Sequence, residues 1–434
     1  MFAYFKASEE LTGVITLPGD KSISHRAAII GSLSSGMSRI HGYSTSADCL
    51  STLRCLGELG VDMKREDEVL VLGGRAEEGF AQPADVLDAG NSGTTMRLLT
   101  GALAGQPVSA TISGDSSLLK RPMDRIIEPL TRMGASIRAG TGEGLPPLEI
   151  KGGRLNGIDF SPPVASAQVK SAVLIAGLNA EGSTTVREKV RTRDHTERML
   201  RRMGINIRSE GTSVVLEPGT PLACDLAIPG DLSSAAFLIS AALVCPGSSI
   251  TLRSVGLNPS RTGFLELLAR MGASIQVNVE PDDSWEPRGE ITAGYSQLKA
   301  IDLSPEDSAR AIDELPLVAF LATQADGITS ISGAGELRAK ESDRITGTVS
   351  ALDRLGARIE ENTDGMKIIG PSRLEGAEVS SICDHRLAMM LAVAGLVAGG
   401  TTSVDGWEWT QVSYPGFLEV LVSLGGGAGV EKRR

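Results

Sequence analysis

Lysine, serine and arginine stand close together in the segment LPGDKSISHR, residues 17–26. Pro18-Gly19-Asp20 predicts a turn, and we expect a helix to begin at Lys21 and Ser22. The first N–H groups of a helix lack partners within the helix and attract anions. Arg26 lies one turn after Ser22, on the same face. The segment indicates an anion site rather than a Walker A loop, although a capped helix with surface cations would have the same composition.

Four more segments of the first half could bind an anionic ligand. The small residues around Gly93 allow a ligand to approach the backbone closely just before a helix. Arg121 and Arg193 add positive charge. Ser166 and Gln168 could serve hydroxyls or a phosphate, but helix capping explains Ser166 equally well. The segments are Asp88–Arg97, Asp115–Met123, Pro162–Ser171 and Thr192–Thr196.

Carboxylates and cations lie beside apolar segments in the second half. They occur in Ala311–Pro316, in Leu337–Arg344 and in Asp384–Arg386, before an apolar helix expected from Leu387. A run of charges is usually a solvated face. Clusters near apolar segments can instead hold pKa values away from their usual range and transfer protons.

A repeated junction indicates which elements position these residues. A Leu-Gly or Met-Gly pair ends an amphipathic segment, and most pairs are followed by a strand-like stretch. Successive pairs are 68 to 84 residues apart by subtraction, and we expect each glycine to adopt a left-handed conformation after a helix. Six such units group most simply as three in each of two domains. The glycines are Gly60, Gly134, Gly204, Gly272, Gly356 and Gly425.

Bulk composition narrows the class of protein. A chain of 434 residues suggests about two domains, and no apolar run is long enough to span a bilayer. We expect no signal peptide, and five cysteines without CxxC spacing favour free thiols in a reducing cytosol over a zinc site. A net charge of −11 and 3% aromatic residues argue against a nucleic-acid partner. These two values do not exclude a locally positive pocket that binds small anions.

Eight motifs taken in order resemble the 5-enolpyruvylshikimate-3-phosphate (EPSP) synthase family over about residues 17 to 417. They read GDKSISHR, AGNSGTTMR, KRPM, SAQVKSA, TRDHT, DELP, RAKESDR and DHRLAM. The resemblance implies an α/β (α+β) fold of two domains, each built of three βαβαββ units with helices inside and sheets outside. Residues 19–229 would form one domain, residues 1–18 and 230–434 the other, with the active site in the cleft between them.

The implied reaction moves the enolpyruvyl group of phosphoenolpyruvate to the 5-hydroxyl of shikimate 3-phosphate and releases phosphate. It passes through a tetrahedral intermediate and belongs to aromatic amino acid (chorismate) biosynthesis. The resemblance implies no metal or organic cofactor, no nucleic acid or membrane partner, and a cytoplasmic monomer.

Residue roles follow from the resemblance by position. Asp313 would be the base, Glu341 the proton donor and acceptor at the methylene group, and Lys21 a contact to both substrates. Shikimate 3-phosphate would be held by Lys21, Ser22, Arg26, Ser166, Ala167, Gln168, Arg193, Asp313 and Lys340. Phosphoenolpyruvate would be held by Lys21, Asn91, Gly93, Arg121, Gln168, Arg344 and Arg386.

One departure and two alternatives bear on this interpretation. Many relatives carry a lysine before the Tyr414-Pro415 position, and Thr410–Pro415 has none here, so this segment receives no role. UDP-N-acetylglucosamine enolpyruvyl transferases typically have Lys-Asn in place of Lys21-Ser22 and a cysteine in the loop that corresponds to Gly114–Lys120, which has none. A non-catalytic protein that binds anions or nucleic-acid ends would not need the two acids Asp313 and Glu341.

The resemblance also implies a response to an inhibitor. Gly93 is the residue type expected where glyphosate can occupy the phosphoenolpyruvate site, so we expect glyphosate to inhibit the enzyme.

Overall fold

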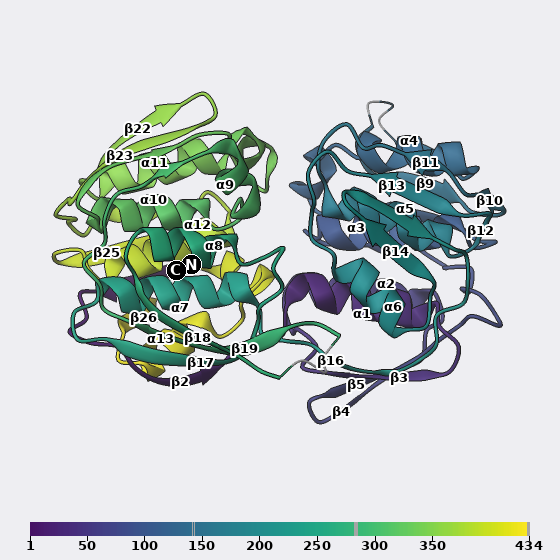
Figure 1. Ribbon diagram of the computed structural model, residues 1–434, viewed down its shortest axis with the longest axis horizontal. Coiled ribbons are helices and arrows are strands. Elements are labelled where there is room, and N and C mark those ends of the chain that lie inside the picture. The colour runs from purple at the N-terminus through teal and green to yellow at the C-terminus, as the bar shows by residue number, and fades with distance from the viewer. Residues whose placement is uncertain (141, 143, 282–284, 432–434) are drawn as a thin grey trace. The chain divides into compact units, whose positions relative to one another are not determined.

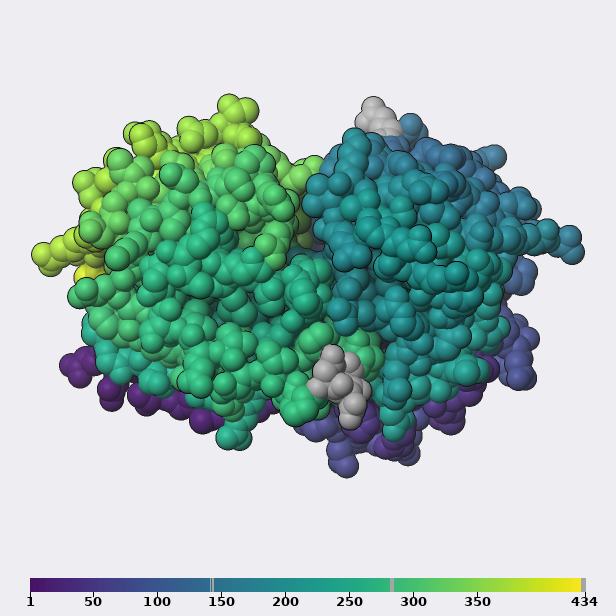
Figure 2. Space-filling view, viewed as in Figure 1, coloured from purple at the N-terminus to yellow at the C-terminus, as the bar shows by residue number. Residues whose placement is uncertain are grey.

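The computed structural model describes residues 1–140, 142, 144–281 and 285–431. Contacts divide the chain into two compact units. The N unit is Gly19–Ile228, and the C unit combines Met1–Pro18 with Pro229–Arg434. The dark purple N-terminal atoms at the lower left of Figure 2, beside teal and green atoms of the second half, belong to the C unit.

Three four-stranded sheets of one design occur among the described residues of the N unit. In each sheet an edge strand runs parallel to the second strand, and the other two pairs are antiparallel. A short parallel pair, β10 (Leu155–Asn156) and β12 (Ala180–Glu181), is separate. In spatial order the sheets are β16 (Asp225–Ala227), β3 (Met37–His41), β5 (Val69–Gly73), β4 (Met63–Glu66); β6 (Leu87–Asp88), β7 (Ser109–Ser113), β9 (Leu148–Lys151), β8 (Ser136–Ala139); and β11 (Asp159–Phe160), β13 (Thr184–Arg187), β15 (Ser213–Leu216), β14 (Ile207–Glu210).

The C unit repeats this design in its described residues. Parallel and antiparallel pairs follow the same order as in the N unit. The sheets are β2 (Thr12–Thr16), β17 (Ser249–Gly256), β19 (Arg288–Gly294), β18 (Ser274–Val279); β20 (Asp302–Leu303), β21 (Gly327–Ile331), β23 (Gly365–Gly370), β22 (Arg358–Asn362); and β24 (Glu378–Ser380), β25 (Thr401–Asp405), β1 (Phe2–Lys6), β26 (Gly427–Glu431).

Two kinds of helix follow from composition. Inner helices are buried over most of their length, as α7 is over all 13 of its residues, and most of them are apolar on nearly every face. In Figure 1, α7, α10 and α12 lie in the middle of the C unit, with strands of its sheets at the periphery. The inner helices are α1 (Lys21–Ser32), α3 (Gly93–Ala104), α5 (Ala167–Gly177), α7 (Leu232–Val244), α10 (Leu315–Gln324) and α12 (His385–Gly395).

The outer helices bury one face only, because their apolar residues recur at helical spacing. They are α2 (Ala47–Glu58), α4 (Asp124–Met133), α6 (His195–Arg202), α8 (Gly263–Arg270), α11 (Arg344–Arg354) and α13 (Phe417–Ser423). The short α9 (Pro305–Arg310) and the 3₁₀ turns η1 (Leu118–Lys120), η2 (Gly335–Ala339) and η3 (Trp407–Val412) complete the elements. Among the described residues, no helix is both long and apolar enough to cross a membrane.

The left-handed conformation expected at six glycines is confirmed. Each follows a helix, and their φ angles run from +79° to +117°. A side chain at such a position would clash with the following backbone, so glycine ends each helix and turns the chain toward the next strand in the same way six times. The predicted fold class, helices inside and sheets outside in both units, is also confirmed.

The chain passes between the units twice, each time directly before an inner helix. β2 pairs with β17 in the C unit, yet it precedes α1 of the N unit. β16 pairs with β3 in the N unit, yet it precedes α7 of the C unit. Gly19 lies at the first passage, where a Cβ atom would stand 1.8 Å from the carbonyl oxygen of Gly42. Only glycine allows the two backbone segments to lie this close.

Candidate functional site

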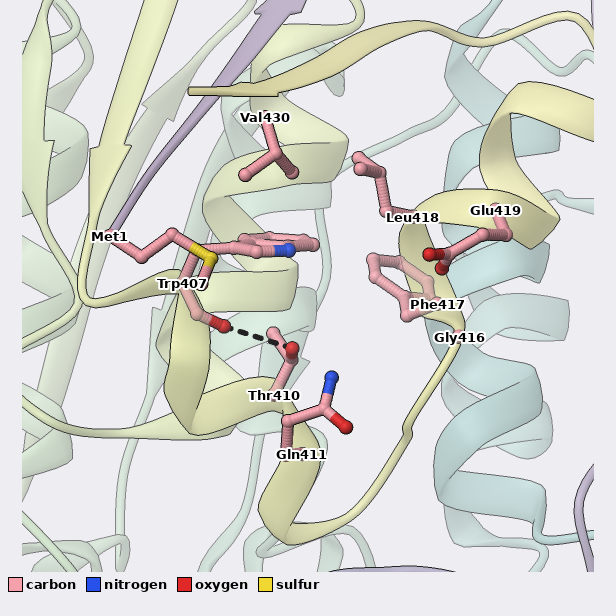
Figure 3. A pocket seen from close by; sticks show the side chains of 9 residues that line it. All are labelled: Met1, Trp407, Thr410, Gln411, Gly416, Phe417, Leu418, Glu419 and Val430. Carbon is pink, nitrogen blue, oxygen red and sulfur yellow. Dashed lines mark hydrogen bonds between the residues drawn. The ribbon is translucent and has the colours of Figure 1, made fainter. Parts of the chain in front are cut away.

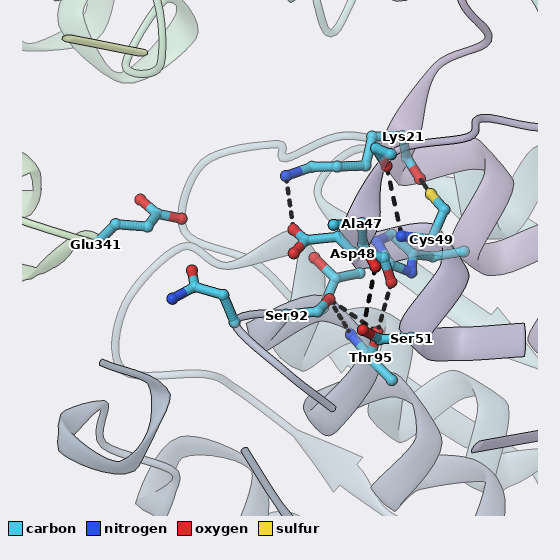
Figure 4. Close-up of polar contacts among 12 residues, drawn as sticks. Lys21, Ala47, Asp48, Cys49, Ser51, Ser92, Thr95 and Glu341 are labelled. Atoms are coloured by element: carbon cyan, nitrogen blue, oxygen red, sulfur yellow. Dashed lines mark hydrogen bonds and ion pairs between the residues drawn. The ribbon is translucent and has the colours of Figure 1, made fainter. Parts of the chain in front are cut away.

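Lys21 is held at the start of α1 by a carboxylate from α2. The Asp20 carboxylate caps α1 by accepting from the N–H of Ile23 at 2.8 Å. Lys21 Nζ lies 2.8 Å from Asp48 Oδ2, and both side chains are largely buried (Figure 4). The Cys49 thiol donates to the carbonyl of Lys21 at 3.6 Å. The ammonium group therefore has a carboxylate beside it and a fixed backbone, and it lies at a helix start, where the dipole favours an anion.

A buried chain of side-chain hydrogen bonds ties α1, α2 and α3 together. His25 Nδ1 lies 2.6 Å from Thr52 Oγ1, which lies 2.7 Å from Thr95 Oγ1. Thr95 in turn bonds Ser92 Oγ, the cap of α3, at 2.8 Å (Figure 4). Burial lowers the pKa of His25 well below 6.5, with Lys21 and Arg26 adding to the effect, so the imidazole stays neutral. The N-terminal turns of the three helices are thus fixed relative to one another.

Arg121 reaches the glycine-rich turn before α3. Its Nη2 donates to Asn91 Oδ1 at 2.8 Å and to Ser117 Oγ at 3.2 Å. The amide of Asn91 donates to Asp115 Oδ2 at 2.7 Å, and the other oxygen of Asp115 accepts the N–H groups of Ser117 and Leu118. The loop carrying Arg121 is therefore braced against the turn carrying Asn91.

Gln168 at the start of α5 meets α3. Its Oε1 accepts from Arg97 Nη1 at 2.8 Å, and its Nε2 donates to Thr94 Oγ1 at 2.9 Å. A Cβ atom on Gly93 would stand 2.7 Å from Arg97 Nη1 and 3.4 Å from Arg121 Nη1. The absence of a side chain at Gly93 lets two guanidinium groups approach the same helix start.

Arg26 is buried between α1, α5 and α6. It donates to Thr196 Oγ1, to Ser171 Oγ and to the carbonyl of Ser22, each at 2.8 Å. Ser166 caps α5 by accepting from the N–H of Val169 at 3.4 Å, which is one of the two explanations that the sequence left open for this serine. Ala167 begins α5, and Arg193 is half-buried in the loop before α6.

In the C unit, Asp313 lies among three cations. Its carboxylate lies 3.3 Å from Lys340 Nζ, 3.7 Å from Arg344 Nη1 and 3.9 Å from Arg386 Nη2. Arg344 is buried and also contacts Glu341 Oε2 at 2.5 Å. The C unit therefore brings together all five of the residues that the sequence assigned to a site in this half.

Helix α12 begins at His385, two residues before the expected start at Leu387. The cause is Asp384, whose carboxylate accepts from the N–H groups of Arg386 and Leu387 and caps the helix. Arg386 consequently stands in the first turn and donates to the carbonyl of Asp313 at 3.1 Å. It also lies 3.6 Å from Glu314 Oε1.

The charges in these two sets differ in balance. Around the starts of α1, α3 and α5, four cations (Lys21, Arg26, Arg97, Arg121) accompany three carboxylates (Asp20, Asp48, Asp115). Around the starts of α10, α11 and α12, four cations (Arg338, Lys340, Arg344, Arg386) accompany five carboxylates (Asp313, Glu314, Glu341, Asp343, Asp384). The described N-unit set therefore suits anion binding, and the C-unit set has acids available for proton transfer.

Asp384 keeps its negative charge although it is fully buried. Burial alone would raise the pKa of this fully buried carboxyl, but the Arg344 guanidinium, 2.8 Å away, more than offsets it and holds the pKa below its usual value. Ser342 Oγ donates to the same oxygen at 3.0 Å. Asp384 thus contacts Nε of Arg344, while Asp313 lies near Nη1 and Glu341 contacts Nη2.

Sequence reasoning missed two residues of the N-unit set. Arg97 lies four residues after Gly93, so the one-turn spacing that drew attention to Arg26 could have found it. Asp48 lies in no motif and reaches Lys21 only because α2 folds back beside α1. Ser171 and Thr196 were quoted within motifs, but their bonds to Arg26 needed the tertiary structure.

A surface pocket of about 250 Å³ lies elsewhere in the C unit (Figure 3). Met1, Trp407, Phe417 and Val430 give it an apolar lining, and Glu419 is its one ionisable side chain. The amino group of Met1 is paired with Glu408 at 2.9 Å. This apolar lining does not suit the anionic ligands that the cations and helix starts of the two sets above indicate.

Comparisons with known proteins agree on one family. The model of "EPSP synthase (3-phosphoshikimate 1-carboxyvinyltransferase)" matches residues 5–421. The 3-phosphoshikimate 1-carboxyvinyltransferase of Bacillus licheniformis is 47% identical over 416 residues, which cover 95% of this chain and 97% of that protein. A solved EPSP synthase from Acinetobacter baumannii is 39% identical with a TM-score of 0.89, covering 99% of both chains. The enolpyruvyl transferase NikO from Streptomyces tendae, 18% identical with a TM-score of 0.79 over 99% of this chain and 98% of its own, shares the fold.

Proposed function

The chain belongs to the EPSP synthase family, and from this we propose how its two sets of residues divide the work of a 3-phosphoshikimate 1-carboxyvinyltransferase. The enzyme transfers the enolpyruvyl group of phosphoenolpyruvate to the 5-hydroxyl of shikimate 3-phosphate and releases phosphate, a step of the shikimate pathway. The observation that carries the assignment is the matched pair of sets, cation-rich in the N unit and acid-rich in the C unit.

The N-unit set, in our proposal, binds the phosphates. Ser22, Arg26, Ser166, Ala167, Gln168 and Arg193 hold shikimate 3-phosphate, and Asn91, Gly93, Arg121 and Gln168 serve phosphoenolpyruvate. Lys21 serves both. Helix starts and planar guanidinium groups both suit phosphate oxygens, and the support here is that three helix starts and four cations are braced together.

The C-unit set carries the proton transfers and completes the binding of both substrates. Glu341 protonates C3 of phosphoenolpyruvate, and positive character develops at C2. The 5-hydroxyl attacks C2 as its proton passes to Asp313, giving a tetrahedral intermediate. Loss of phosphate and return of a proton from C3 to Glu341 restore the double bond. Lys340 binds the hydroxyls of shikimate, and Arg344 and Arg386 bind phosphoenolpyruvate.

Both sets must act on one pair of substrates for this chemistry, so we propose that they meet around the ligands in a cleft between the units. Excluding water there would protect the cationic character at C2 and strengthen each charged contact. We also propose a cytoplasmic monomer, which fits five cysteines that are all free.

Phosphate release tests the function. The purified protein with shikimate 3-phosphate and phosphoenolpyruvate together should release phosphate, and either substrate alone should not. UDP-N-acetylglucosamine in place of shikimate 3-phosphate should give no release, since the matching family is not that of the alternative transferase. Release from phosphoenolpyruvate alone, or none from the mixture, would contradict the assignment.

Glyphosate is expected to inhibit in competition with phosphoenolpyruvate. With no side chain at Gly93, the guanidinium groups of Arg97 and Arg121 both stand close to this helix start, where they can bind an anion. Initial rates at several phosphoenolpyruvate concentrations check this. Turnover that glyphosate leaves unchanged, at phosphoenolpyruvate concentrations near KM, would refute the expectation.

Gly93→Ala should raise the KM for phosphoenolpyruvate about tenfold, because the new methyl group would stand 2.7 Å from Arg97 Nη1 and displace a charged hydrogen-bonding group. The KM for shikimate 3-phosphate should change little. Gly153→Ala is the matched control, since a Cβ atom there meets nothing within 4 Å. Equal phosphoenolpyruvate KM values for the two variants would show that Gly93 does not limit this site.

A further inference from the structure

Three ionisable side chains are buried together in the N unit behind the residues assigned to shikimate 3-phosphate. Lys170 Nζ of α5 lies 2.8 Å from Glu188 Oε2 and 2.8 Å from Glu197 Oε1. The side chains of all three are at most 2% exposed. Glu188 follows β13 and Glu197 lies in α6, so the group, here called the Lys170 triad, joins three elements.

The Lys170 triad also holds the loop between β13 and α6. Glu188 Oε1 accepts a short hydrogen bond from Thr192 Oγ1, and Oε2 accepts from the N–H of Thr192 at 3.4 Å. Lys170 Nζ donates to the carbonyl of Thr192 at 3.5 Å. Thr192 therefore receives three contacts from the triad, and the next residue along the chain is Arg193.

Two residues adjacent to the triad in sequence fix Arg26. Ser171 follows Lys170, Thr196 precedes Glu197, and their hydroxyl oxygens lie 2.7 Å apart. Arg26 donates to both. A shift of α5 against α6 would separate these hydroxyls and move the guanidinium group.

The triad itself is too deeply buried to touch a substrate. Buried ion pairs are commonly no more stabilising than apolar residues of the same size, so stability alone does not account for three charges here. The three charges can instead fix the positions of neighbouring groups, because a carboxylate has four acceptor positions and can hold an ammonium group, a hydroxyl and an N–H at once.

We propose that the Lys170 triad positions the Thr192–Thr196 segment, and through it Arg193 and Arg26, for the phosphate of shikimate 3-phosphate. The inference rests on the proposed function. It adds Lys170, Glu188, Glu197 and Thr192 to the reaction as positioning residues that lie behind the phosphate-binding side chains.

Thr192→Val tests the proposal, because it removes the hydroxyl bond to Glu188 and keeps the three ions paired. We expect the KM for shikimate 3-phosphate, and its dissociation constant by calorimetry without phosphoenolpyruvate, to rise about tenfold, the effect of one lost hydrogen bond to a charged group. The KM for phosphoenolpyruvate, and kcat at saturating shikimate 3-phosphate, should stay near wild type. Thr192→Ser keeps the hydroxyl and should restore the affinity.

Thr184→Val is the matched control. Thr184 is fully buried in β13 of the same unit, and its hydroxyl has no hydrogen-bond partner among the described residues. It should bind shikimate 3-phosphate like wild type. Wild-type affinity in Thr192→Val, or an equal loss for both substrates, would overturn the positioning role. Failure of the wild-type protein to bind shikimate 3-phosphate would instead overturn the proposed function.

Discussion

Asp313→Ala is expected to abolish turnover while shikimate 3-phosphate still binds. The carboxylate contacts Lys340, Arg344 and Arg386 together, and we assign it the proton of the 5-hydroxyl. A positioned general base contributes about 100- to 10,000-fold to a rate. The expected loss in kcat is of that size, measured by phosphate release at saturating substrates, with binding followed by calorimetry.

Asp313→Asn keeps the size of the side chain but removes the carboxylate. It therefore tests proton transfer without changing the shape of the site. It should show the same loss in kcat. Asp326→Ala, at an exposed position in the same unit, is the control and should leave kcat unchanged. Near-normal turnover in Asp313→Asn would remove Asp313 as the base and leave Glu341 as the group to examine next.

Lys170→Met should lower the free energy of unfolding by about 3–5 kcal/mol, because it leaves two buried carboxylates without their shared cation. Urea unfolding of the full chain, followed by far-UV circular dichroism, measures the loss. Lys151→Met replaces an exposed lysine of the same unit and should change stability by less than about 0.5 kcal/mol. Equal losses of unfolding free energy in the two variants would contradict the prediction, because they would show that the two buried carboxylates do not depend on Lys170.

The pH dependence of Lys170→Met follows from Glu197. Burial raises the pKa of this carboxyl above 4.5, and Lys170 partly offsets the rise. A carboxyl whose pKa is raised on folding stabilises the fold below its unfolded value, and this contribution is lost as pH rises through the folded value. Removing Lys170 raises the folded pKa further. The variant should therefore be less destabilised at pH 5 than at pH 8.

Much of the fold could be predicted from local signals in the sequence. A glycine after each amphipathic segment predicted a left-handed turn six times, because this conformation depends on the residue itself. Strand pairing depends on distant partners instead. Nothing in residues 12–16 says that β2 pairs with β17 rather than with strands of the unit that follows it. The resemblance assigned residues 1–18 to the domain of the second half, but the strands with which β2 and β16 pair were visible only in the structure.

The candidate site divides in the same way. Asp313, Lys340, Glu341, Arg344 and Arg386 stand in motifs at the starts of helices, and those motifs were readable. Asp384 was quoted only as the start of a motif, and its role as cap and counter-ion depends on the 2.8 Å approach of Arg344. Asp48 and the Lys170 triad are held by tertiary contacts between helices, so residue type and spacing gave no cue to them.

The course of the chain through the two units has a consequence for synthesis on the ribosome. The N unit is one continuous stretch, so all its strands are available once residue 228 has left the exit tunnel. The C unit must wait far longer. β1, which lies between β25 and β26 in its sheet, is among the first segments made, and its two neighbours are among the last. Throughout elongation the nascent N-terminus must keep a buried strand, with Ala3 and Phe5 on its inner face, unpaired until the final thirty or so residues arrive.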